Sequence, residues 1–148
     1  MYYIGIDLGT SAVKLLLMDE TGTIHNIVSR EYPLEFPQPG WSQQNPQDWK
    51  VAVFSAIPEL LAGYDAASVA GIGCGGQMHG LVVLDENDQV IRPAILWNDG
   101  RTAKEVDYFN RVVGMERDRL LFSWAPKSLQ MVTAAMQLKD TYSLEEKL

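Results

Sequence analysis

Three β-strand patterns follow one another near the start of the chain, and this succession limits the fold more than any other feature. Residues 2–7 and 12–19 are apolar runs, and residues 24–34 alternate apolar and polar positions. Short polar turns separate the three segments. Such a succession predicts a three-stranded antiparallel meander, with Asp7 and a Gly-Thr-Ser turn between its first two strands.

The chain is then expected to leave the sheet and form a helix. Pro37, Pro39 and Gly40 cannot continue a ladder. Asn45 is a favourable N-cap residue before Pro46, and apolar residues recur at helical spacing from Trp49 to Ile57. Pro58 is expected to break or kink this helix, because it lacks an N–H and its ring clashes with the preceding turn.

The next segments predict more strands and a second helix. Residues 68–76 are typical of a buried strand, and residues 80–99 predict a hairpin around "ENDQ". Residues 101–114 predict a helix with Thr102 and Glu105 as a capping box, Val106, Phe109 and Val113 on one face, and Gly114 at its end. A crossover helix that leads from the antiparallel meander to a parallel strand predicts an α/β fold with a mixed sheet.

Charge and cysteine content exclude several classes of function. A net charge of −7 and a pI near 4.7 disfavour nucleic acid and anionic membranes as partners. The single Cys74 cannot form an internal disulfide, and one Cys with two distant His residues cannot assemble a zinc site. The chain shows no apolar leader, so we expect a cytoplasmic protein.

Two nucleotide-binding motifs receive little support. Gly71, Gly73 and Gly76 match G-x-G-x-x-G, but the residues after them predict a loop and a strand, whereas the dinucleotide site needs a helix N-terminus there. The P-loop pattern is absent. The glycines are therefore interpreted as a strand end that allows close approach of backbone or ligand.

The stretch "DLGTSAVK" has the chemistry of a Mg²⁺-phosphate site. Asp7 could hold Mg²⁺ directly or through water, and is the predicted catalytic residue; Gly9 admits close backbone approach, and Thr10, Ser11 and Lys14 supply donors to phosphate. A hairpin that merely uses polar turn residues explains the composition equally well. The stretch resembles the first phosphate-binding motif of the actin-like ATPase superfamily.

Two further polar clusters follow predicted strands. One contains Gln77, Met78 and His79; the other contains Trp97, Asn98, Asp99 and Arg101. Hydrogen-bonding groups beside an aromatic face suit a polyol. An isolated His after a strand is also common as a satisfied surface or core residue.

These clusters, "PGWSQQNPQDW" and the opening motif together resemble the bacterial xylulokinases of the FGGY carbohydrate kinase family over about the first 114 residues. The resemblance implies an actin-like, ribonuclease-H-like first domain, with ATP and Mg²⁺ as cofactors and D-xylulose as the sugar phosphorylated to D-xylulose 5-phosphate. It implies that Met78 and His79 contact the sugar, that Asp7 supports the Mg-triphosphate, and that Gln77 and the second cluster line the sugar cleft.

The resemblance weakens after Gly114, where "LLFSWAPKSLQ" retains only Ala-Pro-Lys of the family pattern. We therefore expect a partial kinase domain over residues 1–114 and a divergent, mainly helical extension over residues 115–148. Family members are several times longer, and their catalytic base and adenosine pocket lie in sequence absent here. The isolated chain is accordingly expected to be nearly inactive.

Three alternatives remain open. An actin-like or chaperone-type ATPase would share only the motif that begins at Asp7. A metal-dependent nuclease of ribonuclease-H-like fold needs several converging acidic residues, and the acidic composition opposes it. A non-catalytic fragment would self-associate, giving a homodimer, through surface that a missing domain normally covers.

Overall fold

The computed structural model describes residues 1–112 of the 148-residue chain, and these residues form two compact units. The first unit comprises residues 1–34 and 44–77, and the described part of the second comprises residues 35–43 and 78–112. Over the described length, no helix is long and apolar enough to cross a membrane.

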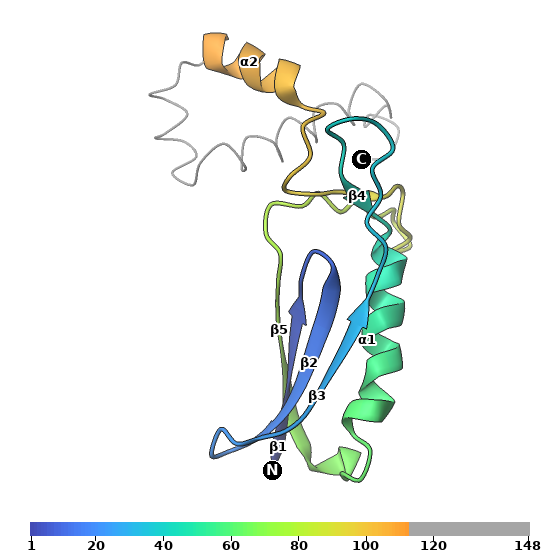
Figure 1. Ribbon diagram of the computed structural model, residues 1–148, viewed down its shortest axis with the longest axis vertical. Coiled ribbons are helices and arrows are strands. Elements are labelled where there is room, and N and C mark those ends of the chain that lie inside the picture. The colour runs from blue at the N-terminus through green and yellow to red at the C-terminus, as the bar shows by residue number, and fades with distance from the viewer. Residues whose placement is uncertain (113–148) are drawn as a thin grey trace. The chain divides into compact units, whose positions relative to one another are not determined.

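The first unit contains a four-stranded mixed sheet in the order β3-β2-β1-β5 (Figure 1). Its strands are β1 (Tyr2–Leu8), β2 (Ala12–Asp19), β3 (Ile24–Glu31) and β5 (Val69–Gly76). The first three form the predicted antiparallel meander, and β5 runs parallel to β1. No helix lies between β5 and the short strand β6 (Ala94–Ile95). The glycines of β5 therefore lack the following helix that a dinucleotide-binding site needs.

Helix α1 (Pro46–Leu60) lies along one face of this sheet (Figure 1). It begins as predicted, because the Asn45 side chain accepts a hydrogen bond from the backbone N–H of Gln47 at 3.0 Å. Alternate residues of the strands meet the apolar side of the helix, which excludes water from one common core. The buried members of this core are Ile4, Val13, Leu15, Leu17, Val28, Tyr32, Ala52, Ala56 and Leu60.

Of the two outcomes expected at Pro58, a break is wrong, because α1 continues through Pro58 to Leu60. A proline near the C-terminal end removes one helical hydrogen bond. Leu60 is fully buried in the core, so its packing favours the extra residues of helix. The next turn is closed by the Leu61 N–H, which donates to the Ile57 carbonyl at 3.0 Å.

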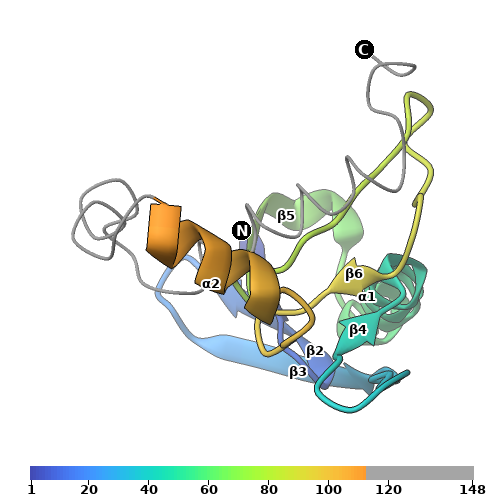
Figure 2. The same ribbon diagram turned by 90° about the horizontal axis from the view of Figure 1, so that it is seen from above.

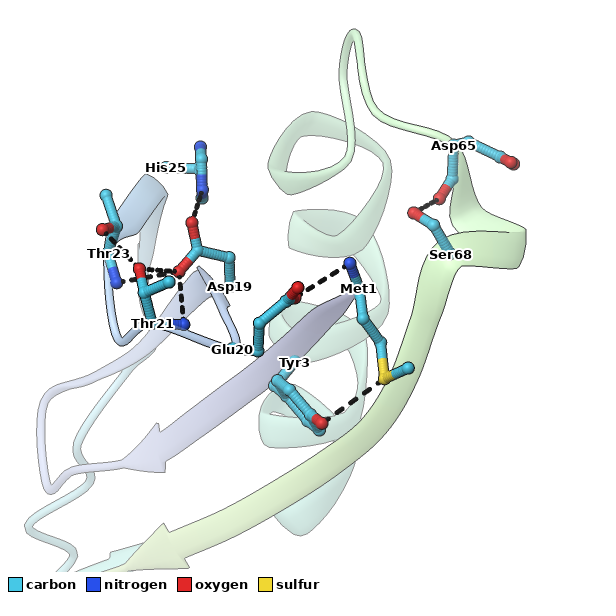
Figure 3. Close-up of polar contacts among 9 residues, drawn as sticks. All are labelled: Met1, Tyr3, Asp19, Glu20, Thr21, Thr23, His25, Asp65 and Ser68. Atoms are coloured by element: carbon cyan, nitrogen blue, oxygen red, sulfur yellow. Dashed lines mark hydrogen bonds and ion pairs between the residues drawn. The ribbon is translucent and has the colours of Figure 1, made fainter.

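The turn between β2 and β3 is organised by Asp19 (Figure 3). Its Oδ1 accepts hydrogen bonds from the backbone N–H groups of Thr21 and Thr23 and from the Thr21 hydroxyl, and its Oδ2 lies 2.8 Å from His25 Nε2. The Thr21 hydroxyl and then His25 hold the pKa of Asp19 well below its ordinary value. The resulting stabilisation is present above that ordinary pKa and is lost as the pH falls below it.

The second unit has little regular structure. Its short sheet pairs β4 (Gln43–Gln44), where the chain passes between the units, with β6 (Figure 2). The hairpin predicted over residues 80–99 does not form two long paired strands. Its two sides are joined by isolated bridges, from Leu81 to Ile95 and from Leu84 to Val90. Pro93 lacks an N–H just before β6, which is one reason that a continuous ladder does not form.

Helix α2 (Ala103–Val112) confirms the second predicted helix, but the predicted capping box is wrong. The Thr102 hydroxyl is buried and has no hydrogen-bond partner in the part of the chain that the structure describes, and the same is true of Glu105 Oε2. Backbone bonds close the first turn instead, with the Val106 N–H donating to the Thr102 carbonyl at 3.0 Å. Val113, Gly114, the side chain of Phe109 and the helix predicted after Ser128 lie outside the described residues.

Candidate functional site

Asp7 lies near the carboxyl end of β1 on the face of the sheet that α1 leaves uncovered. Alternation along β1 separates Asp7 from Ile4, which belongs to the buried core. Its partners on the neighbouring strands are Lys14 on β2 and Gly75 on β5. The Asp7 carboxylate is exposed and makes no hydrogen bond or ion pair with the described residues, so it is available to a ligand.

The turn after β1 is tightly closed. The Gly9 N–H donates to the Ala12 carbonyl at 3.0 Å, and a Cβ at Gly9 would lie 2.9 Å from that same oxygen. A glycine is therefore required there. The Thr10 hydroxyl donates to Gln77 Oε1 at 3.1 Å, so its single proton is already committed within the protein. Ser11 is exposed at the tip of the turn.

Tyr32 braces this turn, a role that the sequence analysis missed. Its hydroxyl donates to the Gly9 carbonyl, and its backbone N–H donates to the Ser11 carbonyl at 3.2 Å. No motif marks this residue, because it follows β3 and reaches the turn only after the meander has folded. The turn is thus held from the side of β3 as well as by β1 and β2.

Burial, and then the negative charge of Asp7, raise the pKa of Tyr32 to about 12. The neutral phenol is the form that donates to Gly9. Because the folded pKa lies above the ordinary one, the contribution to stability is complete below the ordinary pKa and is lost as the pH rises through about 12.

We expect the substitution Asp7→Asn to move the pKa of Tyr32 part of the way back toward its ordinary value, because one of its two causes is removed and burial remains. Titration of tyrosinate absorbance measures this pKa, and Tyr32→Phe identifies which transition belongs to Tyr32. An unchanged transition in Asp7→Asn would show that the two groups do not interact.

Gln77 joins the turn to a buried hydrogen-bond network. Its backbone N–H donates to the Leu8 carbonyl at 2.8 Å, and its Nε2 donates to Gln44 Oε1 at 3.2 Å. With Oε1 accepting from Thr10, the Gln77 side chain is engaged at both ends. Its predicted contact with sugar stays a prediction.

Met78 and His79 belong to the second unit. The Met78 side chain is 62% exposed, like several other large apolar side chains among the described residues. His79 has a φ of 61°, in the left-handed region that residues other than glycine rarely adopt. Such strain persists only where the surroundings impose it, and it is frequent at ligand sites.

Asp99 and Arg101 form a buried ion pair in the second unit. Asp99 Oδ1 accepts from Arg101 Nε, and Asp99 Oδ2 accepts from Arg101 Nη2, both at 2.8 Å. Asp99 also accepts from the backbone N–H groups of Arg101 and Ser42, and the Arg101 guanidinium lies 4.0 Å from the centre of the Trp41 ring. The polar atoms of Asp99 and Arg101 thus form hydrogen bonds within the second unit. Their predicted role in lining a sugar cleft stays a prediction.

The other members of this cluster lie nearer the surface. Trp97 is half-buried and Asn98 is exposed. Asn98 and residues 36–42 line an open hollow of about 510 Å³. An amide beside aromatic and proline side chains is a mixture of polar and apolar groups that small ligands use.

Beside the turn after β1, Asp7 is the carboxylate that could bind Mg²⁺. Among the described residues, no group of three or more His, Cys, Asp or Glu side chains could hold a metal ion. Mg²⁺, however, usually keeps several waters and takes only one or two protein carboxylates beside substrate phosphates. The Asp7 carboxylate, which is exposed and is not paired within residues 1–112, fits that requirement.

The meander, the crossover helix and the parallel β5, with Asp7 beside a tight turn, define part of the first domain of the actin-like ATPase fold of sugar kinases. The family model described as the FGGY family of carbohydrate kinases, N-terminal domain, matches residues 2–138. The chain belongs to this family.

Named relatives agree with this assignment. A xylulose kinase from Bacillus subtilis (strain 168) is 48% identical over 106 residues, which cover 70% of this chain and 21% of the relative. The crystal structure of a xylulose kinase from Rhodospirillum rubrum has a TM-score of 0.76 at 29% identity, covering 80% of this chain and 25% of that one. A gluconate kinase from Lactobacillus acidophilus has a TM-score of 0.74 at 30% identity, covering 80% and 24%. The chain thus spans about a quarter or less of these proteins.

Proposed function

We propose that this chain is part of an ATP-dependent sugar kinase that transfers the γ-phosphoryl group to a hydroxyl of D-xylulose. Relatives named xylulose kinase, at 48% and 44% identity, support the choice of sugar. The structural likeness to a gluconate kinase makes that sugar acid the main alternative substrate. A cytoplasmic location is part of the same proposal.

The proposal rests on one observation, the exposure of the Asp7 carboxylate at the end of β1. A carboxylate with no hydrogen bond or ion pair to the described residues, at a strand end and beside a turn held by Gly9 and Tyr32, suits a site for a hydrated Mg²⁺ and phosphate. When bound, Mg²⁺ would neutralise charge on the phosphate oxygens. Thr10 and the exposed residues Ser11 and Lys14 are the proposed donors to phosphate beside it.

His79 and Met78 are proposed as sugar contacts. The exposed Met78 side chain provides an apolar surface for the C–H face of a sugar, and the His79 ring can bond a hydroxyl. The left-handed backbone of His79 is consistent with a residue that a ligand site holds in place.

Two ligands and two variants test this proposal in one NMR titration of the whole chain. We expect Mg-pyrophosphate to shift the amide resonances of residues 9–11, and D-xylulose to shift those of residues 78 and 79. Asp7→Asn should abolish the first response and preserve the second, whereas His79→Ala should do the reverse. Each variant serves as the folding control for the other.

Glu31→Gln is the matched control for charge, since Glu31 is exposed at the end of β3. It should leave both titrations unchanged. A response to Mg-pyrophosphate without any response to D-xylulose or gluconate would contradict a sugar kinase and favour an actin-like ATPase of another kind. No response to either ligand would contradict both halves of the proposal.

A further inference from the structure

The Gln44 side chain is almost completely buried, with 1% of its surface exposed, and makes four hydrogen bonds. Its Nε2 donates to the Thr10 carbonyl at 2.7 Å and to the Pro33 carbonyl at 3.1 Å. Its Oε1 accepts from Trp49 Nε1 at 3.1 Å and from Gln77 Nε2 at 3.2 Å. Carbonyls only accept and an indole N–H only donates, so the partners determine the orientation of the amide.

The contacts of Gln44 form a closed ring with the turn after β1. Gln44 donates to the backbone of Thr10, the Thr10 hydroxyl donates to Gln77, and Gln77 donates back to Gln44. The ring joins three segments that are far apart in sequence: the turn after β1, the end of β4 and the residue that follows β5. Hydrogen bonds in such buried networks reinforce one another, and losing one member leaves its partners unsatisfied.

We infer that Gln44 is a positioning residue, which fixes the phosphate-binding turn at Thr10 and the end of β5 at Gln77 in one arrangement. This inference rests on the proposed function, since it is that function that gives the turn its ligand. Gln44 itself has no polar group left for a ligand, because both of its N–H bonds and its acceptor oxygen are occupied within the protein. It acts only through Thr10 and Gln77.

The positions of Thr10 and Gln77 matter because of what they adjoin. Thr10 lies in the turn beside Asp7, and Gln77 immediately precedes Met78 and His79 in the chain. Transfer between two bound groups loses rate steeply when either is misplaced by about 1 Å. Trp49, near the start of α1, also fixes the Gln44 side chain, because its indole N–H donates a hydrogen bond to Gln44 Oε1.

Amide hydrogen exchange on the full chain tests this role without any ligand. Gln44→Met keeps a side chain of similar length and removes the four hydrogen bonds of the Gln44 amide. We expect the amides of Gly9 and Gln77 to exchange about tenfold faster or more, as two or more net hydrogen bonds are lost. The amides of Asp19 and Leu61, which lie far from Gln44 in the same unit, should keep their wild-type rates.

Gln44→Glu adds a pH profile that a merely structural role would not produce. A neutral carboxyl can donate to the Thr10 carbonyl, whereas the ionised form cannot. Exchange at Gly9 and Gln77 should therefore approach wild-type rates at low pH and accelerate as the introduced carboxyl ionises. This variant also replaces Gln44→Met if the latter fails to fold. Gln47→Met, at an exposed position of α1, is the matched control and should change nothing.

Two results would overturn the inference. Wild-type exchange at Gly9 and Gln77 in Gln44→Met would show that the turn does not depend on Gln44. An equal acceleration at all four amides would show a loss of overall stability instead of local positioning. Because exchange needs neither pyrophosphate nor sugar, failure of this inference is distinguishable from failure of the proposed function, which the ligand titrations decide.

Discussion

Replacing Asp99 with Asn is expected to destabilise the second unit by about 3–5 kcal/mol, the cost of breaking a buried ion pair by changing one partner. The side chains of Arg101 and Asp99 are only 4% and 1% exposed, so Arg101 cannot turn to water when its partner loses its charge. The Asn amide can still accept from the Ser42 N–H but cannot match the two-pronged bond to the guanidinium.

Urea denaturation followed through the exchange of the Leu96 and Gly100 amides measures this effect. These amides report on the second unit, because they donate to the Ser42 and Gly40 carbonyls. Asp107→Asn makes the same change at an exposed position of α2 and should alter stability by less than about 0.5 kcal/mol. Adding Arg101→Met to Asp99→Asn should recover part of the loss, since it removes the buried unpaired charge. A loss under about 1 kcal/mol in Asp99→Asn would show that the pair is effectively solvated.

The chain by itself is expected to phosphorylate D-xylulose at least about a thousandfold more slowly than the 1–100 per second typical of kinases. Phosphoryl transfer depends on holding the nucleotide, Mg²⁺ and the acceptor hydroxyl together. The chain covers 21% of the length of the Bacillus subtilis relative and 24% of the Klebsiella pneumoniae relative, so most of the groups that do this lie in other parts of such proteins.

An assay of ADP formation with D-xylulose and Mg-ATP measures this rate. The whole xylulose kinase of Bacillus subtilis, assayed beside it, is the positive control. Turnover by the 148-residue chain within the range of ordinary kinases would contradict the expectation. It would also show that the described residues, with the remainder of this chain, suffice for both substrates.

The sequence predicted the elements that depend on local patterns. The meander followed from apolar runs separated by short turns, and the start of α1 followed from Asn45 and Pro46, because both signals act within a few residues. The sequence failed where tertiary packing competes with local rules. Burial of Leu60 carries α1 past Pro58, and the Thr102 hydroxyl is buried without making its capping bond.

The same division holds for the candidate site. Asp7 and Gly9 could be identified because a carboxylate and a glycine turn between apolar runs are an unusual local pattern. Tyr32 and Gln44 could not be identified, since nothing in their neighbours shows that one side chain reaches Gly9 and the other reaches Thr10. Gln44 lies in "PGWSQQNPQDW", a stretch that predicts the start of α1 and carries a family resemblance but does not indicate the contacts of Gln44.

The sequence by itself therefore determined the family of this chain, the order of the meander, α1, β5 and α2, and the carboxylate at the end of β1. Only the tertiary structure decided that Thr10 and Gln77 form a hydrogen bond and that Gln44 closes the ring between them. It also decided that Asp99 and Arg101 form a buried ion pair. The physical reason is that hydrogen bonds between side chains depend on distances between segments far apart in the chain, and those distances exist only once the sheet and helix have packed.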